Sequence, residues 1–282
     1  MTFKLVVSLT TTPQRLPAVG RTIKSILKNT IKPDAIFLHL PEVLKRTGQK
    51  YPAIPEELTK MKHLRINRTD DIGPATKLLP ITQKIKDGNT YIVVIDDDVL
   101  YPKDFIESLL TVSTQFPNSV ITGYGYPDIC STKVLDKYVY STCMCAGFAG
   151  YMLQRSMLNG WKKNIPLDVN NLSCFLSDDL TISNHFLNKH IPIIALKIPY
   201  LVAKLKIDQI SGALHLIDSN FVKYSKCAAF LKTEGILNHK MKLHEKSYIN
   251  QLMEMTDSLH PYLLKYLGSV IRRKVKYQKT NN

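Results

Sequence analysis

The sequence predicts an α/β domain built on a mainly parallel sheet, and three observations carry this prediction. Apolar strand-like runs alternate with helix-like segments along the first two-thirds of the chain, as in sheets with crossover helices. The run at residues 91–95 is apolar and mostly β-branched, which is typical of a strand buried on both faces. Three aspartates follow this run directly, at the strand end where open α/β sheets bind ligands.

The individual elements follow from the same patterns. Strands are predicted at residues 5–9, 35–40, 63–67, 91–95, 120–123 and 192–196. Helices are predicted at residues 16–29, 77–86, 103–115 and 180–189, and the stretch from 123 to 166 is expected to be irregular. After about residue 219 the pattern becomes Lys-rich and helical, with helices at 221–233 and 246–267. We therefore divide the chain into an α/β domain, residues 1–220, and a basic helical C-terminal extension, residues 221–282.

Composition narrows the class of protein. A 282-residue chain with 44% hydrophobic residues can bury a sizeable core. It has no uninterrupted apolar window of about eighteen residues, which argues against a membrane-spanning helix. The apolar run at 5–9 is read as the first strand rather than a signal peptide. Five cysteines without zinc-like spacing predict reduced structural thiols and a cytoplasmic location.

The net charge of +15 is concentrated toward the C-terminus. Residues 272–279 contain five Lys or Arg and no acid. Such a tail is commonly a solvated helix end, and the functional alternative is peripheral contact with an anionic membrane. A nucleic-acid partner is not expected, because the chain shows no RNP-like aromatic pattern and no zinc-finger spacing.

The aspartate triplet suggests a metal site. Side chains alternate along an extended chain, so Asp96 and Asp98 should point to one side and Asp97 to the other. Two converging carboxylates repel each other unless a cation lies between them, and Mg²⁺ or Mn²⁺ suits such oxygen ligands. The alternative is a charged loop before the helix predicted at 103–115.

Two further segments extend this pattern. Asp70-Asp71-Ile-Gly-Pro-Ala-Thr-Lys77 joins acids, a Gly-Pro turn and a lysine, and Thr10-Thr-Thr-Pro-Gln-Arg15 follows the first predicted strand. Together with the triplet they resemble nucleotide-sugar-dependent glycosyltransferases of the GT-A fold. The likeness is to bacterial and large-virus sequences, including a viral β-rhamnosyltransferase domain, and it covers roughly residues 4 to 230. It implies a Rossmann-like, mainly parallel sheet flanked by helices, with residues 1–220 as the GT-A catalytic domain.

The resemblance assigns a donor site to these segments. Thr10 and Thr12 would meet the base and ribose, and Arg15 the phosphate. The alternative is a threonine cap before a proline that starts a helix.

The second segment supplies the rest of this donor site. Asp71 and Gly73 would contact the nucleotide, and Lys77 its phosphate. Asp96 and Asp97 would contribute from the triplet. A capped turn with a surface lysine is the alternative for the second segment.

The resemblance also implies a third metal ligand and a base. His215 falls about where relatives place a metal-binding histidine, although a lone histidine among apolar residues is more often a core residue. Asp179, with Asp178 beside it, matches the motif that supplies the catalytic base in inverting relatives. The alternative is an acidic helix N-terminus stabilised by the helix dipole. The small-residue turn at 145–150 would flank donor sugar and acceptor.

The leading hypothesis is thus a Mn²⁺- or Mg²⁺-dependent, inverting glycosyltransferase with a nucleotide-sugar donor, UDP-sugar above all, and a glycan or other hydroxyl acceptor. A nucleotidyl- or phosphoryl-transfer enzyme could use the same carboxylates and Lys77, but the chain has no P-loop motif. The non-enzymatic alternative is a basic module that binds nucleic acid or membrane.

Overall fold

The structure is a computed structural model that describes residues 4–126, 132–197, 206–207 and 220–241. The strands of the main sheet are β1 (Leu5–Thr10), β2 (Ala35–Leu40), β5 (Leu64–Arg68), β6 (Tyr91–Val94), β8 (Val120–Thr122), β9 (Lys133–Val134), β10 (Val139–Thr142), β11 (Tyr151–Gln154) and β12 (Ile193–Leu196). Two small sheets pair β3 (Val43–Leu44) with β4 (Gln49–Lys50) and β7 (Val99–Leu100) with β13 (Lys206–Ile207). The α-helices are α1 (Val19–Leu27), α2 (Glu56–Thr59), α3 (Ile81–Lys84), α4 (Phe105–Gln115), α5 (Leu172–Phe175), α6 (Asp178–Asn188) and α7 (Asn220–Thr233). Short 3₁₀ turns are η1 (Ala75–Lys77), η2 (Arg155–Leu158) and η3 (Trp161–Lys163).

The main sheet is mixed rather than mainly parallel. Its order in the described residues is β5-β2-β1-β6-β11-β8-β12-β10-β9. The first four strands are parallel, as predicted from the alternation of strands and helices. The second half departs from the prediction, because β11 is antiparallel to both β6 and β8, and β10 is antiparallel to β12 and β9. Three of these strands lie in the stretch expected to be irregular, where runs of two to four residues are too short to show a period.

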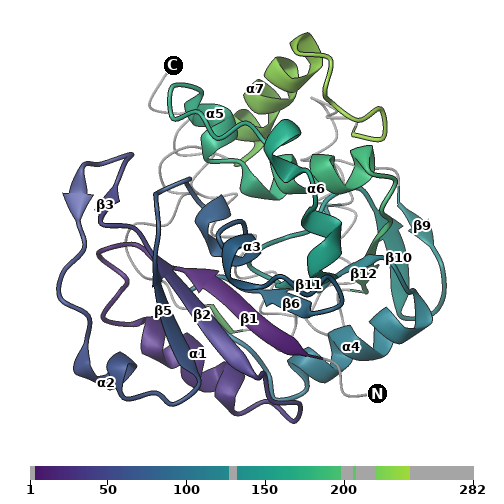
Figure 1. Ribbon diagram of the computed structural model, residues 1–282. Helices are drawn as coiled ribbons and strands as arrows, with labels where there is room; N and C mark the ends of the chain where they lie inside the picture. Colours follow the sequence, from purple (N-terminus) through teal and green to yellow (C-terminus); the bar gives the residue numbers. More distant parts are fainter. Residues whose placement is uncertain (1–3, 127–131, 198–205, 208–219, 242–282) are drawn as a thin grey trace, which may run out of the picture.

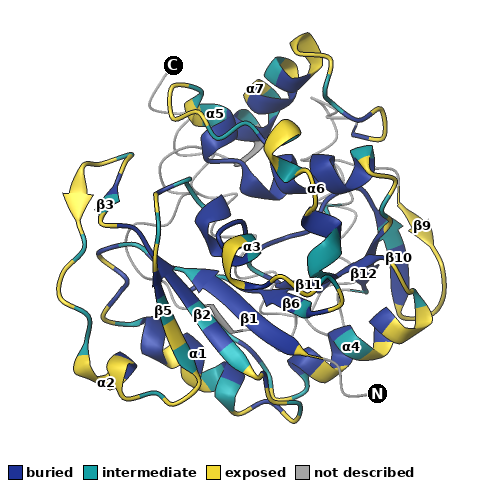
Figure 2. Ribbon diagram, viewed as in Figure 1, coloured by how far each residue is buried: buried dark blue, intermediate teal, exposed yellow. Residues whose placement is uncertain are grey.

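Helices cover both faces of the sheet. Figure 1 shows α1 and α4 against one face and α3 and α6 against the other, with α5 and α7 beyond α6. Alternate residues of the central strands divide between the two layers: Val6, Ile92 and Val94 pack toward α3 and α6. Val7 and Val93 pack toward α1 and α4. Figure 2 shows the central strands and α6 almost wholly buried. Side chains at the ends of these strands and at the start of α6 are therefore mounted on well-packed elements.

Most of the remaining predicted elements are present, with one clear error. The helix predicted at 77–86 is divided into η1 and the four-residue α3. Pro80 lies between them, and a proline lacks the N–H that a continuous helix would need there. The helix predicted at 246–267 and the basic tail at 272–279 lie outside the described residues.

The expectation of reduced cysteines was wrong. Cys174 and Cys227 form a disulfide, and Cys143 is disulfide-bonded as well, whereas Cys145 is free and buried. The Cys174–Cys227 bond joins residues 53 positions apart. Motif spacing in the sequence can reveal only local pairs, so it could not indicate this bond. The disulfide ties α7, from the predicted extension, to α5, and Tyr224 and Leu231 of α7 belong to the same core cluster as Val6.

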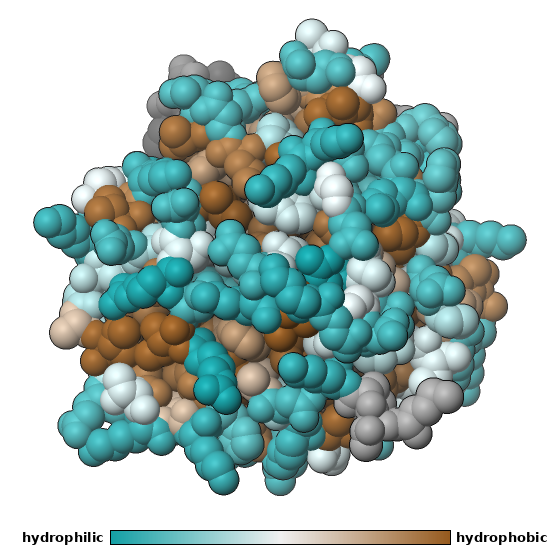
Figure 3. All heavy atoms as spheres, in the orientation of Figure 1, coloured by the Kyte–Doolittle hydropathy of each residue, from teal (hydrophilic) through white to brown (hydrophobic). Residues whose placement is uncertain are grey.

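The surface of the described residues is mixed. On the face shown in Figure 3 hydrophilic residues predominate, and hydrophobic residues gather in several separate patches. The most exposed large apolar side chains include Val134 and Tyr138 of the β9–β10 region. None of the helices in the described ranges combines the length and apolar character that crossing a membrane requires.

Replacing both Cys174 and Cys227 by serine should lower the free energy of unfolding by about 2–4 kcal/mol, because the bond restricts the unfolded chain. Urea denaturation of the double variant and the parent protein, both without reductant, measures this loss. The Cys145→Ser variant is the matched control, since Cys145 is buried and forms no disulfide. Equal stability of the double variant and the parent would show that the bond contributes nothing to the fold.

Candidate active site

The predicted site segments meet where the strand order of the sheet reverses. From β1 the chain builds outward through β2 to β5, and it then returns to add β6 on the other side of β1. Open α/β sheets bind ligands outside the carboxyl ends of their strands at such a point. Thr10 is the last residue of β1 and residues 11 and 12 follow it, while residues 96–98 follow β6, so both segments lie at this edge of the sheet.

The triplet does not alternate as expected. The strand ends at Val94, and Asp97 and Asp98 form a turn, so their side chains do not follow the two-residue period. Arg15 bridges these two residues, with Nη1 2.7 Å from Asp97 Oδ1 and Nη2 2.9 Å from Asp98 Oδ2. Thr11 donates a further hydrogen bond to Asp97 Oδ2 at 2.5 Å. The predicted phosphate ligand Arg15 is therefore a buried counter-ion of the triplet, and Asp97 is a structural partner of that ion.

The carboxylates still repel one another. Burial raises the pKa of Asp98 to about 7, and the neighbouring charges of Asp96 and Asp97 add to the shift. Burial also raises the pKa of Asp97. Burial alone would lower the pKa of Arg15, but the charges of Asp97 and Asp98 hold it above its ordinary value. One guanidinium thus only partly offsets the negative charge gathered at the end of β6.

Lys77 joins the triplet to the second acidic motif. Its Nζ lies 2.7 Å from Asp96 Oδ1 and 2.9 Å from Asp178 Oδ2, and its side chain is 6% exposed. Burial alone would lower the pKa of this lysine, but the charges of Asp178 and Asp96 hold it well above its ordinary value. The sequence predicted a lysine that reaches a phosphate. In the structure its ammonium is committed to two carboxylates that are 82 positions apart in the chain.

The predicted base, Asp179, lies in the first turn of α6 beside Asp178. Its Oδ1 accepts a hydrogen bond from the Gly147 N–H at 3.0 Å, and its Oδ2 accepts bonds from Tyr126 OH at 3.1 Å and Tyr224 OH at 3.3 Å. Burial raises its pKa to about 7, the charge of Asp178 adds to this, and Lys77 counteracts it. A carboxylate with a pKa near neutrality suits general-base chemistry.

Gly147, in the predicted small-residue turn, is the point where these groups come together. A Cβ built there would fall on Lys77 Nζ and lie 3.0 Å from Asp96 Oδ1 and 3.1 Å from Asp179 Oδ1. The glycine therefore leaves room for side chains of the protein itself, and its N–H is used by Asp179.

The other predicted donor-site residues have local roles. Thr10 donates to the backbone carbonyl of His39 at 2.8 Å. Asp71 accepts bonds from the N–H groups of Lys45 at 2.7 Å and Gly73 at 2.8 Å, so it shapes its own loop. Gly73 has a φ of +69° and packs against Phe175, which a side chain at this position would meet. Neither Asp71 nor Gly73 needs a ligand to explain its place.

Three buried side-chain oxygens around the cluster have no hydrogen-bond partner within the described parts of the chain. They are Thr12 Oγ1, Tyr151 OH and Asp178 Oδ2, the last being ion-paired with Lys77 outside hydrogen-bond geometry. A buried polar atom without a partner costs about 1–3 kcal/mol. A polar group of a ligand could satisfy such atoms. Among the residues predicted to contact the donor, Thr12 is the one whose hydroxyl has no partner in the described parts of the chain.

The fit of a divalent metal depends on Asp96 and Asp98. In the described ranges no three His, Cys, Asp or Glu side chains converge as a complete protein site would require, and His215 lies outside those ranges. Mg²⁺, however, is commonly held by one or two carboxylates together with substrate phosphates. The carboxylate oxygens of Asp96 and Asp98 therefore suit a hard cation in ligand chemistry, and each side chain also pairs with a cation of the protein, Lys77 or Arg15.

Sequence reasoning missed a buried polar chain that supports Lys77. Ser8 Oγ donates to the Lys77 carbonyl at 2.6 Å, and it lies 3.0 Å from His39 Nε2. Nε2 therefore carries the proton, and His39 Nδ1 accepts from Asn67 Nδ2 at 2.8 Å. Burial lowers the His39 pKa to about 3, in agreement with a neutral ring. The only signal in the sequence was one polar residue inside each of two apolar strands, Ser8 in β1 and His39 in β2. Tyr126 and Tyr224 gave no signal, because nothing in the sequence relates them to Asp179.

Comparison with known proteins adds no assignment. No protein-family model matches the chain, and no curated protein matches it significantly.

Lys77→Met should lower the free energy of unfolding by about 3–5 kcal/mol, because it leaves two buried carboxylates without their cation. Chemical denaturation checks this, with Lys84→Met as control, since Lys84 is an exposed lysine of α3. A loss below about 1 kcal/mol would contradict the central place given to Lys77.

Proposed function

We propose that this chain is a metal-dependent glycosyltransferase that moves a sugar from a nucleoside-diphosphate donor to an acceptor hydroxyl. The observation that carries the proposal is the link made by Lys77. Through its contacts with Asp96 and Asp178, a strand-end acid motif and a helix-start acid pair become one buried site at the switch point of the sheet. A GT-A fold is the finer part of this proposal. It is supported by the four parallel strands and by the likeness of the motifs.

Each group has a role in this reaction. Asp96 and Asp98 would hold Mn²⁺ or Mg²⁺, which when bound stabilises the charge of the departing diphosphate. Thr12, whose buried Oγ1 has no hydrogen-bond partner in the described parts of the chain, would contact the nucleotide of the donor, for which we favour a UDP-sugar. Asp179 takes the proton of the acceptor hydroxyl as that oxygen attacks the anomeric carbon, and displacement from the face opposite the diphosphate inverts the configuration. Asp178 pairs with Lys77 and holds the start of α6 in place.

The alternative functions fit the site less well. A phosphoryl- or nucleotidyl-transfer enzyme would use the same carboxylates, but the sequence has no P-loop motif and its acidic motifs resemble those of glycosyltransferases. A basic binding module does not explain why five buried or half-buried aspartates gather at one edge of the sheet. Burying such charges is costly unless they serve a structural or chemical purpose.

The disulfide between Cys174 and Cys227 bears on the compartment in which the protein folds. The cytoplasmic expectation depended on reduced cysteines, and the Cys174–Cys227 disulfide removes that ground. Disulfides form and persist mainly in oxidising environments. We therefore propose that the protein folds in an oxidising compartment. Contact of the basic C-terminus with an anionic membrane stays a proposal, since that segment lies outside the described residues.

Binding of UDP should require a divalent cation. Calorimetry with UDP is expected to show binding in the presence of Mn²⁺ and none in excess EDTA. Asp98→Asn should reduce the Mn²⁺-dependent affinity at least about tenfold, in line with the cost of disturbing a metal site. Asp136→Asn, in an exposed turn, should leave it unchanged. Equal binding with and without EDTA would remove the metal from the proposed reaction.

Asp179→Asn should lower kcat by about 10²–10⁴-fold, because the amide keeps the shape of the side chain but cannot take a proton. UDP affinity should barely change. Since Asp179 works as a carboxylate and its pKa is about 7, wild-type kcat/KM should fall as the pH drops below about 7 and level off above it. Screening nucleotide-sugars for turnover, followed by NMR of the product, measures the rate and the configuration. A mutant of near-normal rate, or a product of retained configuration, would refute this role.

A further inference from the structure

Asp179 Oδ2 is held by two phenols that come from separate parts of the chain. Tyr126 follows β8, and Tyr224 lies on α7, about a hundred residues later. The two rings pack edge to face, with centroids 6.0 Å apart and an interplanar angle of 83°. Tyr224 is 6% exposed, so its hydroxyl is placed inside the protein rather than at the surface.

We infer that α7 is a working part of the active site and that Tyr224, together with Tyr126, is a positioning residue for Asp179. The inference rests on the proposed function in that Asp179 is taken as the base. It assigns to the C-terminal part of the chain a role that neither the motifs nor the family resemblance indicated.

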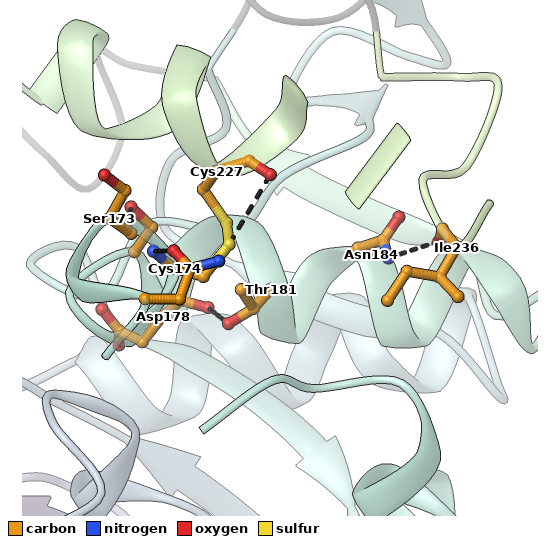
Figure 4. The surroundings of a disulfide bond; sticks show 9 residues. Ser173, Cys174, Asp178, Thr181, Asn184, Cys227 and Ile236 are labelled. Atoms are coloured by element: carbon orange, nitrogen blue, oxygen red, sulfur yellow. Dashed lines mark hydrogen bonds between the residues drawn. A yellow bond between two sulfur atoms is a disulfide. The ribbon is translucent and has the colours of Figure 1, made fainter. Parts of the chain in front are cut away.

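A second contact joins the same two parts of the protein. Cys227 lies three residues after Tyr224 on α7, and Cys174 lies five residues before Asp179. The Cys174–Cys227 disulfide and the Tyr224–Asp179 hydrogen bond therefore connect α7 to the region around the start of α6 about one helical turn apart. Figure 4 shows Asp178 close to the disulfide, and α7 packs against α5. Near the other end of α6, Asn184 Nδ2 donates to the Ile236 carbonyl at 2.9 Å, which further holds the segment after α7.

The two oxygens of Asp179 have different surroundings. Oδ2 faces Tyr126 and Tyr224, whereas Oδ1 faces the cluster of Lys77 and Asp96 across Gly147. Each carboxylate oxygen can accept two hydrogen bonds, so Oδ1 keeps one acceptor position beside its bond from Gly147. Anchoring Oδ2 thus directs Oδ1 toward the side of the site where the proposed donor would bind.

The phenols also favour the charged form of the carboxyl. Burial raises the pKa of each tyrosine well above the ordinary value, so both hydroxyls keep their protons at neutral pH and can donate hydrogen bonds to Asp179. A hydrogen bond donated to a carboxylate lowers its pKa, and Tyr126 acts on Asp179 in this direction. The ionisable groups that face Asp179 from the surrounding elements are Asp178, Lys77, Asp96, Cys145, Tyr126, Tyr151 and Tyr224.

The test measures the titration of Asp179 directly and needs no substrate. The protein is labelled with ¹³C at the aspartate carboxyl carbons, and the Asp179 signal is identified by its loss in Asp179→Asn. We expect Tyr224→Phe and Tyr126→Phe each to move the titration midpoint up by about one pH unit, which corresponds to about 1.4 kcal/mol. Tyr138→Phe, a tyrosine that is 53% exposed, is the control and should leave the midpoint in place. An unchanged midpoint in folded Tyr224→Phe overturns the inference.

The disulfide provides a second arm of the test. The variant carrying Cys174→Ser and Cys227→Ser keeps Tyr224 but loses the neighbouring covalent link, so its Asp179 midpoint should move in the same direction as in Tyr224→Phe. A midpoint equal to that of the parent would show that the disulfide does not place Tyr224. The proposed function fails separately, if Asp179→Asn retains normal turnover while the midpoint shifts are observed.

Discussion

The ammonium of Lys77, held between Asp96 and Asp178, is the contact on which the rest of the site depends. Taking three charges out of water costs several kcal/mol for each ion, and their attraction offsets this only when the geometry is good. Two features of the fold support that geometry. Ser8 holds the Lys77 backbone carbonyl through the chain that continues to His39, and Gly147 leaves the space that the ammonium occupies.

The charge balance of the cluster explains what kind of ligand it suits. Three aspartates follow β6 and two begin α6, and they are matched by two buried cations, Arg15 and Lys77. Burial raises the pKa values of Asp98 and Asp179 to about 7, and the excess of negative charge adds to both shifts. An anionic diphosphate would not approach such a site by itself. A divalent cation would both relieve the repulsion and attract the phosphate, which is the physical case for a metal at this edge of the sheet.

Elements from the second half of the chain surround the proposed base. The helix α6 is buried along its first ten residues and begins with the two acids, so it presents them from a rigid support. The helix α7 is linked to α5 by the Cys174–Cys227 disulfide, and it brings Tyr224 to Asp179 at the start of α6. Tyr126 comes from the loop after β8, next to a strand that the sequence pattern did reveal. The proposed base on α6 is thus held by residues from three other parts of the chain, Tyr126, Gly147 and Tyr224.

The sequence by itself determined the parallel half of the sheet and the segments that gather at its edge. The apolar runs of β1, β2 and β6 predict buried strands, because burial on both faces demands such runs, and the polar motifs after β1 and β6 mark their ligand-facing ends. The sequence could not determine which charges neutralise each other. Arg15 and Lys77 looked like free phosphate ligands, and only the tertiary structure showed them paired with Asp97, Asp98, Asp96 and Asp178. The short antiparallel strands, the disulfide and the contact of Tyr224 were also settled only by the fold. Each of these depends on residues far apart in the chain, and local periodicity carries no information about which distant segments will meet.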